Sequence, residues 1–282
     1  MLITNVLRLA SLSLCLFFSA SLAAETLFTA TYKGKHSGIS IKLTRELEQL
    51  SETEFRLHSK AKSFIGSITE LSQFKLENGT IIPSQYDYSR KVFGRKSVQT
   101  LSFDWENKHA DYKRSDKPER NATYALTPNA LDPSLYQLKL QQELFRGQDT
   151  FNFDFAKDGR MKNIAFSVTS KSTQYRLDKR ELEATQVERI NYGKEKKTEI
   201  LLLPALQYQI AEIVHTETDG SQYKLSLVDF KSDRDALSRF YNAISITENT
   251  DSSELAKQSS NILMVPERTG LGIMADESIN SQ

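Results

Sequence analysis

Residues 151–168, FNFDFAKDGRMKNIAFSV, contain two runs of alternating apolar and polar side chains on either side of Asp158-Gly159. Successive side chains of an extended strand point to opposite faces, so each run can bury one face of a sheet and expose the other. Asp-Gly tolerates the positive φ angles that a tight hairpin turn requires. The stretch therefore predicts two antiparallel strands joined by a short turn.

The same pattern recurs from Leu27 to about Phe230, where Asn78-Gly79 and Asp219-Gly220 separate further apolar runs. Alternation is also clear in residues 101–105, 206–210 and 223–227. Three such turns between alternating runs indicate an antiparallel meander. We therefore expect a mainly β protein with one large curved antiparallel sheet, open or half-barrel, on which one or two short helices pack.

Two amphipathic segments interrupt the strands. Asp132 can cap a helix whose first turn holds Pro133, because proline lacks the N–H that would be unpaired there. Leucines at roughly helical spacing follow before Gly147, namely Leu135, Leu138, Leu140 and Leu144. A second short helix is expected from Asp233 to Ile244. Both apolar stripes are expected to cover the sheet rather than bind a partner.

The N-terminus has the pattern of a secretory signal peptide over residues 1–23. Arg8 supplies the positive charge, Leu9 to Phe18 is apolar, and cleavage is expected after Ala23, with Ala24 as the alternative. An uncleaved anchor is the other interpretation, although the apolar run is shorter than the roughly 20 residues of a membrane span. We expect a periplasmic mature chain that has no transmembrane segment and no cysteine.

The mature chain divides into a β-rich domain over residues 24–244 and a flexible polar tail over residues 245–282. The tail is rich in Ser, Thr, Asn, Asp and Glu, so it buries too little surface to offset its ordering entropy. Its exception is the apolar run 262–265, either a short docking strand or an incidental apolar stretch.

Most catalytic patterns are missing from the sequence. The chain has 37 Lys and Arg against 36 Asp and Glu, and this balance argues against a nucleic-acid partner. It contains no nucleotide-binding glycine motif and no nucleophile elbow. None of the four histidines, His36, His58, His109 and His215, lies within four residues of another. We expect no catalytic residues, no metal site, no cofactor and no enzyme activity.

Candidate binding residues lie around a basic segment, residues 90–96, which has four cations and neighbouring aromatic side chains. The segment could face an anionic surface such as lipid headgroups or a polysaccharide, or it could be a hairpin tip made soluble by charge. An apolar concave face of the sheet is expected to carry Phe55, Leu57, Phe64, Ile68, Phe74, Tyr86, Tyr88, Phe103 and Trp105, as core or as the wall of a ligand cavity. The candidate ligand-binding residues are Tyr86, Tyr88, Arg90, Arg95, Phe103 and Trp105.

An ordered set of short motifs supports a resemblance to a known family. The pattern Tyr86-x-Tyr88-x-Arg90, then Gly94-Arg95, then Phe103-Asp104-Trp105 resembles the centre of the DUF3108 family, a domain of unknown function in exported bacterial proteins. The resemblance implies an all-β periplasmic domain without an established enzyme activity. A looser likeness at the level of the fold links it to the lipoprotein-carrier proteins, in which helices close a curved sheet over an apolar cavity.

Two functions are compatible with these expectations. The first is a periplasmic, non-catalytic binding or envelope-maintenance protein that holds a hydrophobic or amphiphilic ligand. The second is a scaffold or adaptor that acts through a sheet edge or through the C-terminal tail. The expected partners are an envelope lipid or an envelope protein.

Overall fold

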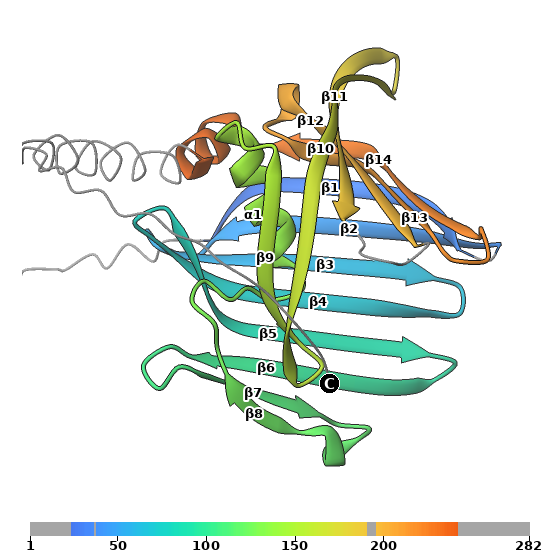
Figure 1. Cartoon of the computed structure of the whole chain (residues 1–282). Coiled ribbons are helices and arrows are strands. Elements are labelled where there is room, and N and C mark those ends of the chain that lie inside the picture. The colour runs from blue at the N-terminus through green and yellow to red at the C-terminus, as the bar shows by residue number, and fades with distance from the viewer. Residues whose placement is uncertain (1–23, 37, 191–195, 242–282) are drawn as a thin grey trace, which may run out of the picture.

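The computed structural model describes residues 24–36, 38–190 and 196–241, and these residues form one antiparallel sheet of 14 strands (Figure 1). The strands are β1 (Glu25–His36), β2 (Ile39–Gln49), β3 (Glu54–Ser63), β4 (Gly66–Glu77), β5 (Thr80–Val92), β6 (Arg95–Asp104), β7 (His109–Arg114), β8 (Ala122–Ala125), β9 (Thr150–Lys157), β10 (Arg160–Leu177), β11 (Arg180–Ile190), β12 (Lys197–Leu203), β13 (Gln209–Thr216) and β14 (Gln222–Ser232). The predicted fold class is confirmed. The expected signal peptide and tail lie outside the described residues.

The strand order follows from successive hairpins. From β1 the sheet grows strand by strand to β8 on one side, and from β14 back to β9 on the other, with β1 and β14 paired in the middle. The predicted turns occur with the expected geometry: φ is 48° and 71° at Asn78-Gly79, and 53° and 75° at Asp158-Gly159. Gly220, in the third predicted turn, also has a positive φ of 77°.

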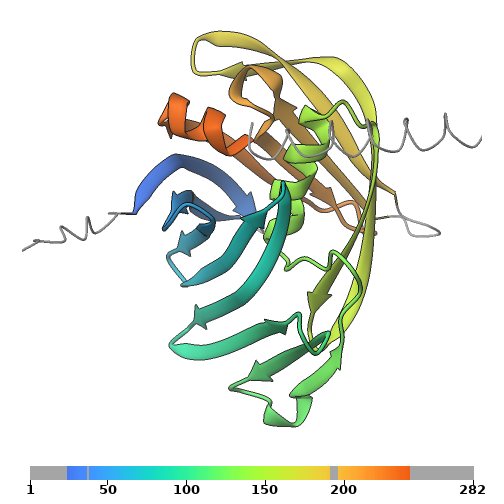
Figure 2. The same cartoon turned by 90° about the vertical axis from the view of Figure 1, so that its left-hand side faces the viewer.

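The sheet curls until its two ends come close without pairing (Figures 1 and 2). Leu131, in the segment after β8, donates its N–H to Asp154 of β9 over 2.9 Å and accepts from Ala156 over 2.8 Å. The β9–β10 turn contacts β8, since a Cβ placed on Gly159 would lie 3.3 Å from the Cβ of Ala122. The β9–β10 hairpin therefore faces the inner side of strands β4 to β7.

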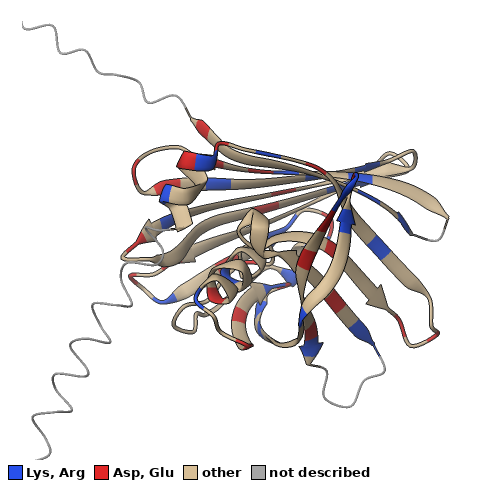
Figure 3. Ribbon diagram, turned by 90° about the horizontal axis from the view of Figure 1, so that it is seen from above, with Lys and Arg blue, Asp and Glu red and all other residues tan. Residues whose placement is uncertain are grey.

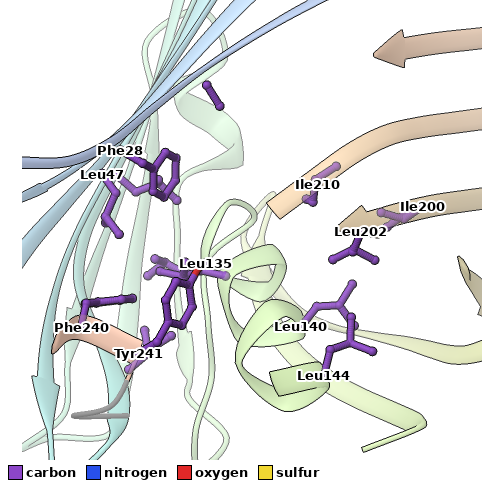
Figure 4. Packing of buried hydrophobic residues seen from close by; sticks show 14 of the residues in the cluster. Phe28, Leu47, Leu135, Leu140, Leu144, Ile200, Leu202, Ile210, Phe240 and Tyr241 are labelled. Carbon is purple, nitrogen blue, oxygen red and sulfur yellow. The ribbon is translucent and has the colours of Figure 1, made fainter. Parts of the chain in front are cut away.

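The helix α1 (Leu135–Phe145) lies inside the curve of the sheet (Figure 2). Its leucines point in two directions: Leu135 lies on the side of Phe28 from β1, while Leu140 lies on the side of Leu202 from β12 (Figure 4). All four predicted leucines are buried. The helix therefore covers the sheet and ends before Gly147, as predicted, and Gly147 has a φ of 82°. It also fills the space between the two halves of the sheet, which was not predicted.

A second helical segment, residues 234–241, covers the same core. Leu237, Phe240 and Tyr241 are buried, and the ring of Phe240 packs edge-on against Phe55 with 5.0 Å between centroids. The predicted helix is confirmed over these residues, and its expected last residue, Ile244, lies outside the described part. Neither described helix is long and apolar enough to span a bilayer.

Two expectations are wrong. Phe64 does not lie on the apolar face: it occupies the β3–β4 turn, where alternation ends, and 84% of its surface is exposed. Residues 206–210 do not form a continuous strand. Pro204–Leu206 form a 3-10 turn, and Gln207 and Tyr208 adopt left-handed φ values of 54° and 57°, so β13 begins only at Gln209.

Candidate functional site

A cavity of about 300 Å³ lies where the β9–β10 hairpin faces strands β4 to β7. We call it the tyrosine cavity, because Tyr86, Tyr88 and Tyr112 line it. The other lining residues are Glu70, Gln99, Thr100, Leu101, Pro133, Ala156, Lys157 and Asp158. Ala156 of β9 packs in one apolar cluster with residues of β5, β6 and β7, so the cavity lies between the two ends of the sheet.

Strand register produces the wall of the tyrosine cavity. Residues directly opposite each other in an antiparallel pair share a face of the sheet. One row across β5, β6 and β7 is Tyr86, Leu101 and Tyr112, and the adjacent row across β4, β5 and β6 is Glu70, Tyr88 and Gln99. The inner face of the wall therefore combines phenol rings with an apolar leucine, the carboxylate of Glu70 and the amide of Gln99.

Hydrogen bonds join the two rows. The Tyr86 hydroxyl donates to Oε1 of Glu70 over 2.6 Å, and the Tyr112 hydroxyl donates to Oε1 of Gln99 over 3.1 Å. Tyr88 lies between them and finds no hydrogen-bond partner among the described residues. Its hydroxyl is therefore available to a bound molecule.

Burial keeps the phenols neutral. It raises the pKa of Tyr86 far above the usual value, and the nearby Glu70 carboxylate raises it further. Burial also raises the pKa of Tyr88, again reinforced by Glu70 and opposed by the positive charge of Arg90. Both phenols are therefore protonated at neutral pH and can donate or accept a hydrogen bond.

A buried carboxyl group lies behind the cavity. Oδ1 of Asp132 accepts the N–H groups of Ser134 and Leu135, each over 2.8 Å, which caps α1 as predicted. Burial raises the pKa of Asp132 to about 7, while these two N–H groups and the Ser72 hydroxyl oppose the rise. The side chain is therefore only partly ionised near neutral pH.

The six predicted binding residues do not form one cluster. Tyr86 and Tyr88 lie together in the tyrosine cavity, and Arg90 follows on the same face of β5 but is exposed. Phe103 packs against the apolar cluster that includes Tyr86. Arg95 begins β6, whereas Trp105 follows its last residue, so these two lie at opposite ends of that strand.

Trp105 has a structural environment at its end of β6. Its ring stacks on Phe103 with 5.9 Å between centroids, and its Nε1–H donates to the carbonyl of Pro83 over 2.7 Å. Trp105 therefore closes the edge of the apolar cluster and does not line the cavity. Sequence reasoning missed Glu70, Gln99, Tyr112 and Asp158, because only the pairing of distant strands brings them together.

A second hollow, of about 520 Å³, lies between α1, β9 and the β4–β5 turn. Its charged side chains already neutralise each other: Lys139 lies 2.7 Å and Arg146 3.3 Å from Oε1 of Glu143. This makes it a weaker candidate than the tyrosine cavity. In the described part of the chain, no three His, Cys, Asp or Glu side chains are grouped as metal ligands.

The chain was compared with curated proteins, solved structures and protein families. No curated protein matches the sequence. A similar solved structure is the β-barrel-like protein of domain of unknown function DUF1849 from Brucella abortus, which is 11% identical, with a TM-score of 0.44 over 74% of this chain and 99% of that one. Residues 27–228 match the family described as "Protein of unknown function (DUF3108)". Since this match covers most of the chain, the protein belongs to the DUF3108 family.

Proposed function

We propose that the protein is a periplasmic, non-catalytic binding protein that holds a small amphiphilic ligand in the tyrosine cavity. The signal-peptide pattern of residues 1–23 supports the location. The observation that carries the binding role is a partly open cavity with phenolic and apolar walls and one uncommitted hydroxyl, on Tyr88. Ligand sites are typically lined by aromatic side chains with a few polar groups that orient the ligand.

The size of the cavity limits the ligand. Its volume of about 300 Å³ is at the lower end of the range for small-molecule sites. The rest of the concave space is occupied by α1 and its buried leucines (Figure 4). A ring or a short chain fits this cavity better than a long acyl chain. Its apolar part would contact Leu101 and Ala156, and its polar part would face Tyr88 and the charged Lys157 and Asp158.

The side chains of the cavity favour binding over reaction. Its titratable groups are three tyrosines, two carboxylates and one lysine, and no histidine or cysteine is among the lining residues. The raised pKa values of Tyr86, Tyr88 and Tyr112 keep these phenols protonated. Nucleophilic catalysis needs an activated nucleophile beside a base, and this lining offers none.

A scaffold role through a sheet edge has less support. The edge strand β8 is only four residues long. The other edge strand, β9, is partly covered because Leu131 exchanges backbone hydrogen bonds with it. Short and covered edges are ways in which proteins avoid edge-to-edge pairing.

Binding can be tested with the fluorescent amphiphile N-phenyl-1-naphthylamine and the mature chain. Ala156→Phe places a ring in the cavity and should abolish the fluorescence gain, whereas Ala165→Phe adds the same ring farther along the hairpin, outside the cavity, and should not. Ala156 is buried and lines the cavity, while Ala165 pairs with Asn152 toward the other end of the hairpin and does not line it. Equal probe binding by both variants would refute the proposal.

Tyr88→Phe provides a second test that does not alter packing. It removes only the uncommitted hydroxyl, so the affinity of the protein for 1-naphthol, a polar analogue of the probe, should fall while thermal stability stays unchanged.

Native mass spectrometry of protein from the host envelope should detect a bound small molecule that is lost in Ala156→Phe. The intact mass of the exported protein should correspond to cleavage after Ala23 or Ala24.

A further inference from the structure

Three hairpins place their turns at one end of the sheet, on the right in Figure 1: β1–β2, β3–β4 and β5–β6. Two large apolar side chains lie at these turns with almost no protein contact. Phe64 in the β3–β4 turn is 84% exposed, and Phe93 in the β5–β6 turn is 79% exposed. The two turns touch, since Phe93 donates its backbone N–H to the carbonyl of Ile65 over 3.1 Å. The exposed rings therefore belong to one continuous tip.

Phe93 occupies a backbone position that disfavours phenylalanine. Its φ is 47° and that of Gly94 is 78°, the geometry of a turn that strongly prefers Asn-Gly or Asp-Gly. The corresponding positions in two other hairpins hold Asn78 and Asp158, with φ values of 48° and 53°. A bulky residue at positive φ is strained, and Phe93 recovers none of that cost by packing. Folding alone does not explain this ring.

A line of cations runs behind the rings. Cross-strand pairing joins Lys33 to Lys42, Lys42 to Lys62, Lys62 to Ser67, Ser67 to Lys91, and Lys91 to Lys96. We call the five lysines the lysine row. All are exposed, and they alternate with inner-face residues such as Tyr32 and Leu43, so they lie on the outer face of β1 to β6. The row crosses six adjacent strands, about 24 Å at the usual strand spacing.

The three hairpins at this end carry only positive charge. Asp116 lies beside them, in one hollow with Phe93 and Lys96, but its carboxylate is paired with Arg114. Segments 31–42, 60–69 and 89–98 contain three, two and four Lys or Arg, respectively, and no Asp or Glu. The rest of the chain has 28 Lys and Arg against 36 Asp and Glu, so the positive excess of the sequence comes from these three segments. Figure 3 shows where the basic and acidic residues lie along the ribbon. No lysine of the row forms an ion pair with another described residue, whereas Lys224 on the neighbouring β14 lies 2.8 Å from Glu212. Like charges directly opposite each other destabilise a sheet.

We propose that this end of the sheet docks on a bilayer of anionic phospholipids, with Phe64 and Phe93 entering the acyl boundary and the lysine row lying against the headgroups. The order of the groups matches the layers of a membrane, since the apolar rings are outermost and the cations lie just behind them. Lys33, Lys42 and Lys62 line a wide hollow of about 630 Å³, and the row continues beyond it to Lys91 and Lys96. A line of cations longer than one hollow suits an extended anionic surface better than a single small anion. Membrane docking does not depend on a ligand in the tyrosine cavity.

The test uses the mature chain and two kinds of vesicle, pure phosphatidylcholine and an equal mixture of phosphatidylcholine and phosphatidylglycerol. Co-sedimentation should be strong with the mixture, weak with pure phosphatidylcholine, and reduced by salt, because basic residues near an anionic surface are screened within a Debye length. Lys42→Gln with Lys62→Gln should weaken binding and lower its salt dependence. The control Lys171→Gln with Lys231→Gln, which removes two exposed cations outside the row, should bind as the wild type does.

The decisive variant is Phe93→Asn combined with Phe64→Ser. It should lower the vesicle partition coefficient by about tenfold or more, since two buried rings are lost. Thermal stability should stay the same or rise, because asparagine tolerates the left-handed turn. A misfolded variant would show a lower melting temperature, so the two effects are separable. Unchanged vesicle binding would overturn the proposal. The proposal would also be overturned if neither protein bound vesicles and analytical sedimentation showed that the wild type forms dimers and the variant does not.

The vesicle experiment also separates this proposal from the ligand role. Ala156→Phe alters the tyrosine cavity only and should bind anionic vesicles as the wild type does. Conversely, the Phe93→Asn and Phe64→Ser variant should bind N-phenyl-1-naphthylamine in the absence of vesicles as the wild type does. Loss of vesicle binding in Ala156→Phe, with its melting temperature unchanged, would contradict the tip as the docking site.

Discussion

The hydroxyl of Tyr86 lies 2.6 Å from Oε1 of Glu70 and donates a hydrogen bond to it across the β4–β5 pair. The two residues are not directly opposite each other: Glu70 pairs with Tyr88, and Tyr86 pairs with Ser72. The bond is therefore diagonal and joins adjacent rows of the cavity wall. It holds a carboxylate in a cavity that is otherwise phenolic and apolar.

Tyr86→Phe is expected to lower the free energy of unfolding by about 1–3 kcal/mol, because the carboxylate of Glu70 loses its donor in a partly buried place. Urea denaturation measures the effect. Tyr124→Phe is the matched control, since the Tyr124 hydroxyl is buried and has no hydrogen-bond partner among the described residues. That control should be neutral or slightly stabilising, and equal losses in both variants would contradict the role given to the Glu70 bond.

The stability of the protein should depend on the ionisation of Asp132. Its pKa in the folded state is about 7, above the usual value of 3.8, so the folded protein binds a proton that the unfolded chain lacks between these values. Its contribution to the free energy of unfolding is then largest below about pH 4, falls as the pH rises from about 4 to about 7, and levels off above pH 7. The full change is at most about 4 kcal/mol.

Asp132→Asn isolates that contribution. The amide keeps an oxygen for the N–H groups of Ser134 and Leu135 but does not titrate. Relative to the wild type, the variant should therefore gain stability between pH 5 and pH 8. Chemical denaturation at both pH values measures the difference, in which the other titrating groups cancel. Parallel pH profiles for the two proteins would show that Asp132 does not titrate in this range.

The interior helix should carry much of the stability. Leu140 is fully buried on the side of α1 that faces Leu202 (Figure 4). Leu140→Ala should cost about 2–5 kcal/mol, the range for cavities left in a packed core. Lys139→Ala, one residue away, loses a partly exposed ion pair with Glu143, which keeps Arg146 as a partner, and should cost less than about 1 kcal/mol. If Leu140→Ala lowered the free energy of unfolding by no more than Lys139→Ala does, packing of α1 against β12 would not contribute much to stability.

The local elements were predictable because their determinants are close in sequence. Asn78-Gly79 and Asp158-Gly159 each specify a turn with positive φ, and the alternating runs beside them specify strands. The helix α1 follows from an Asp132 cap and from leucine spacing, and both are visible within about ten residues. The prediction that Phe64 lies on the apolar face was wrong, because an alternating pattern does not reveal which apolar residue falls in the turn.

The tyrosine cavity was only partly predictable. Tyr86 and Tyr88 were visible because they share one strand, whereas Tyr112 and Asp158 come from strands distant in the chain. Their meeting depends on register over several strands and on the curl that brings β9 against β7. The lysine row has the same origin, since its five members are spread over five strands and no short segment reveals that they align.

Replacing Gly66, at the end of the sheet that holds the lysine row, should destabilise the protein. A Cβ on this residue would lie 2.1 Å from the carbonyl oxygen of Lys91 and 3.0 Å from the Cα of Val92, so it would meet backbone and not a flexible side chain. Strand β5 would have to move away, and overpacking of this kind typically costs about 1–3 kcal/mol. Gly66→Ala should therefore lower the midpoint of thermal unfolding clearly, while Ser67→Ala beside it should not.

Because the displaced strand carries Lys91 and leads into the Phe93 turn, Gly66→Ala should also weaken binding to phosphatidylglycerol vesicles at temperatures where the variant is still folded. If both properties stay at wild-type values, the close contact between Gly66 and Lys91 does not determine how this end of the sheet is built.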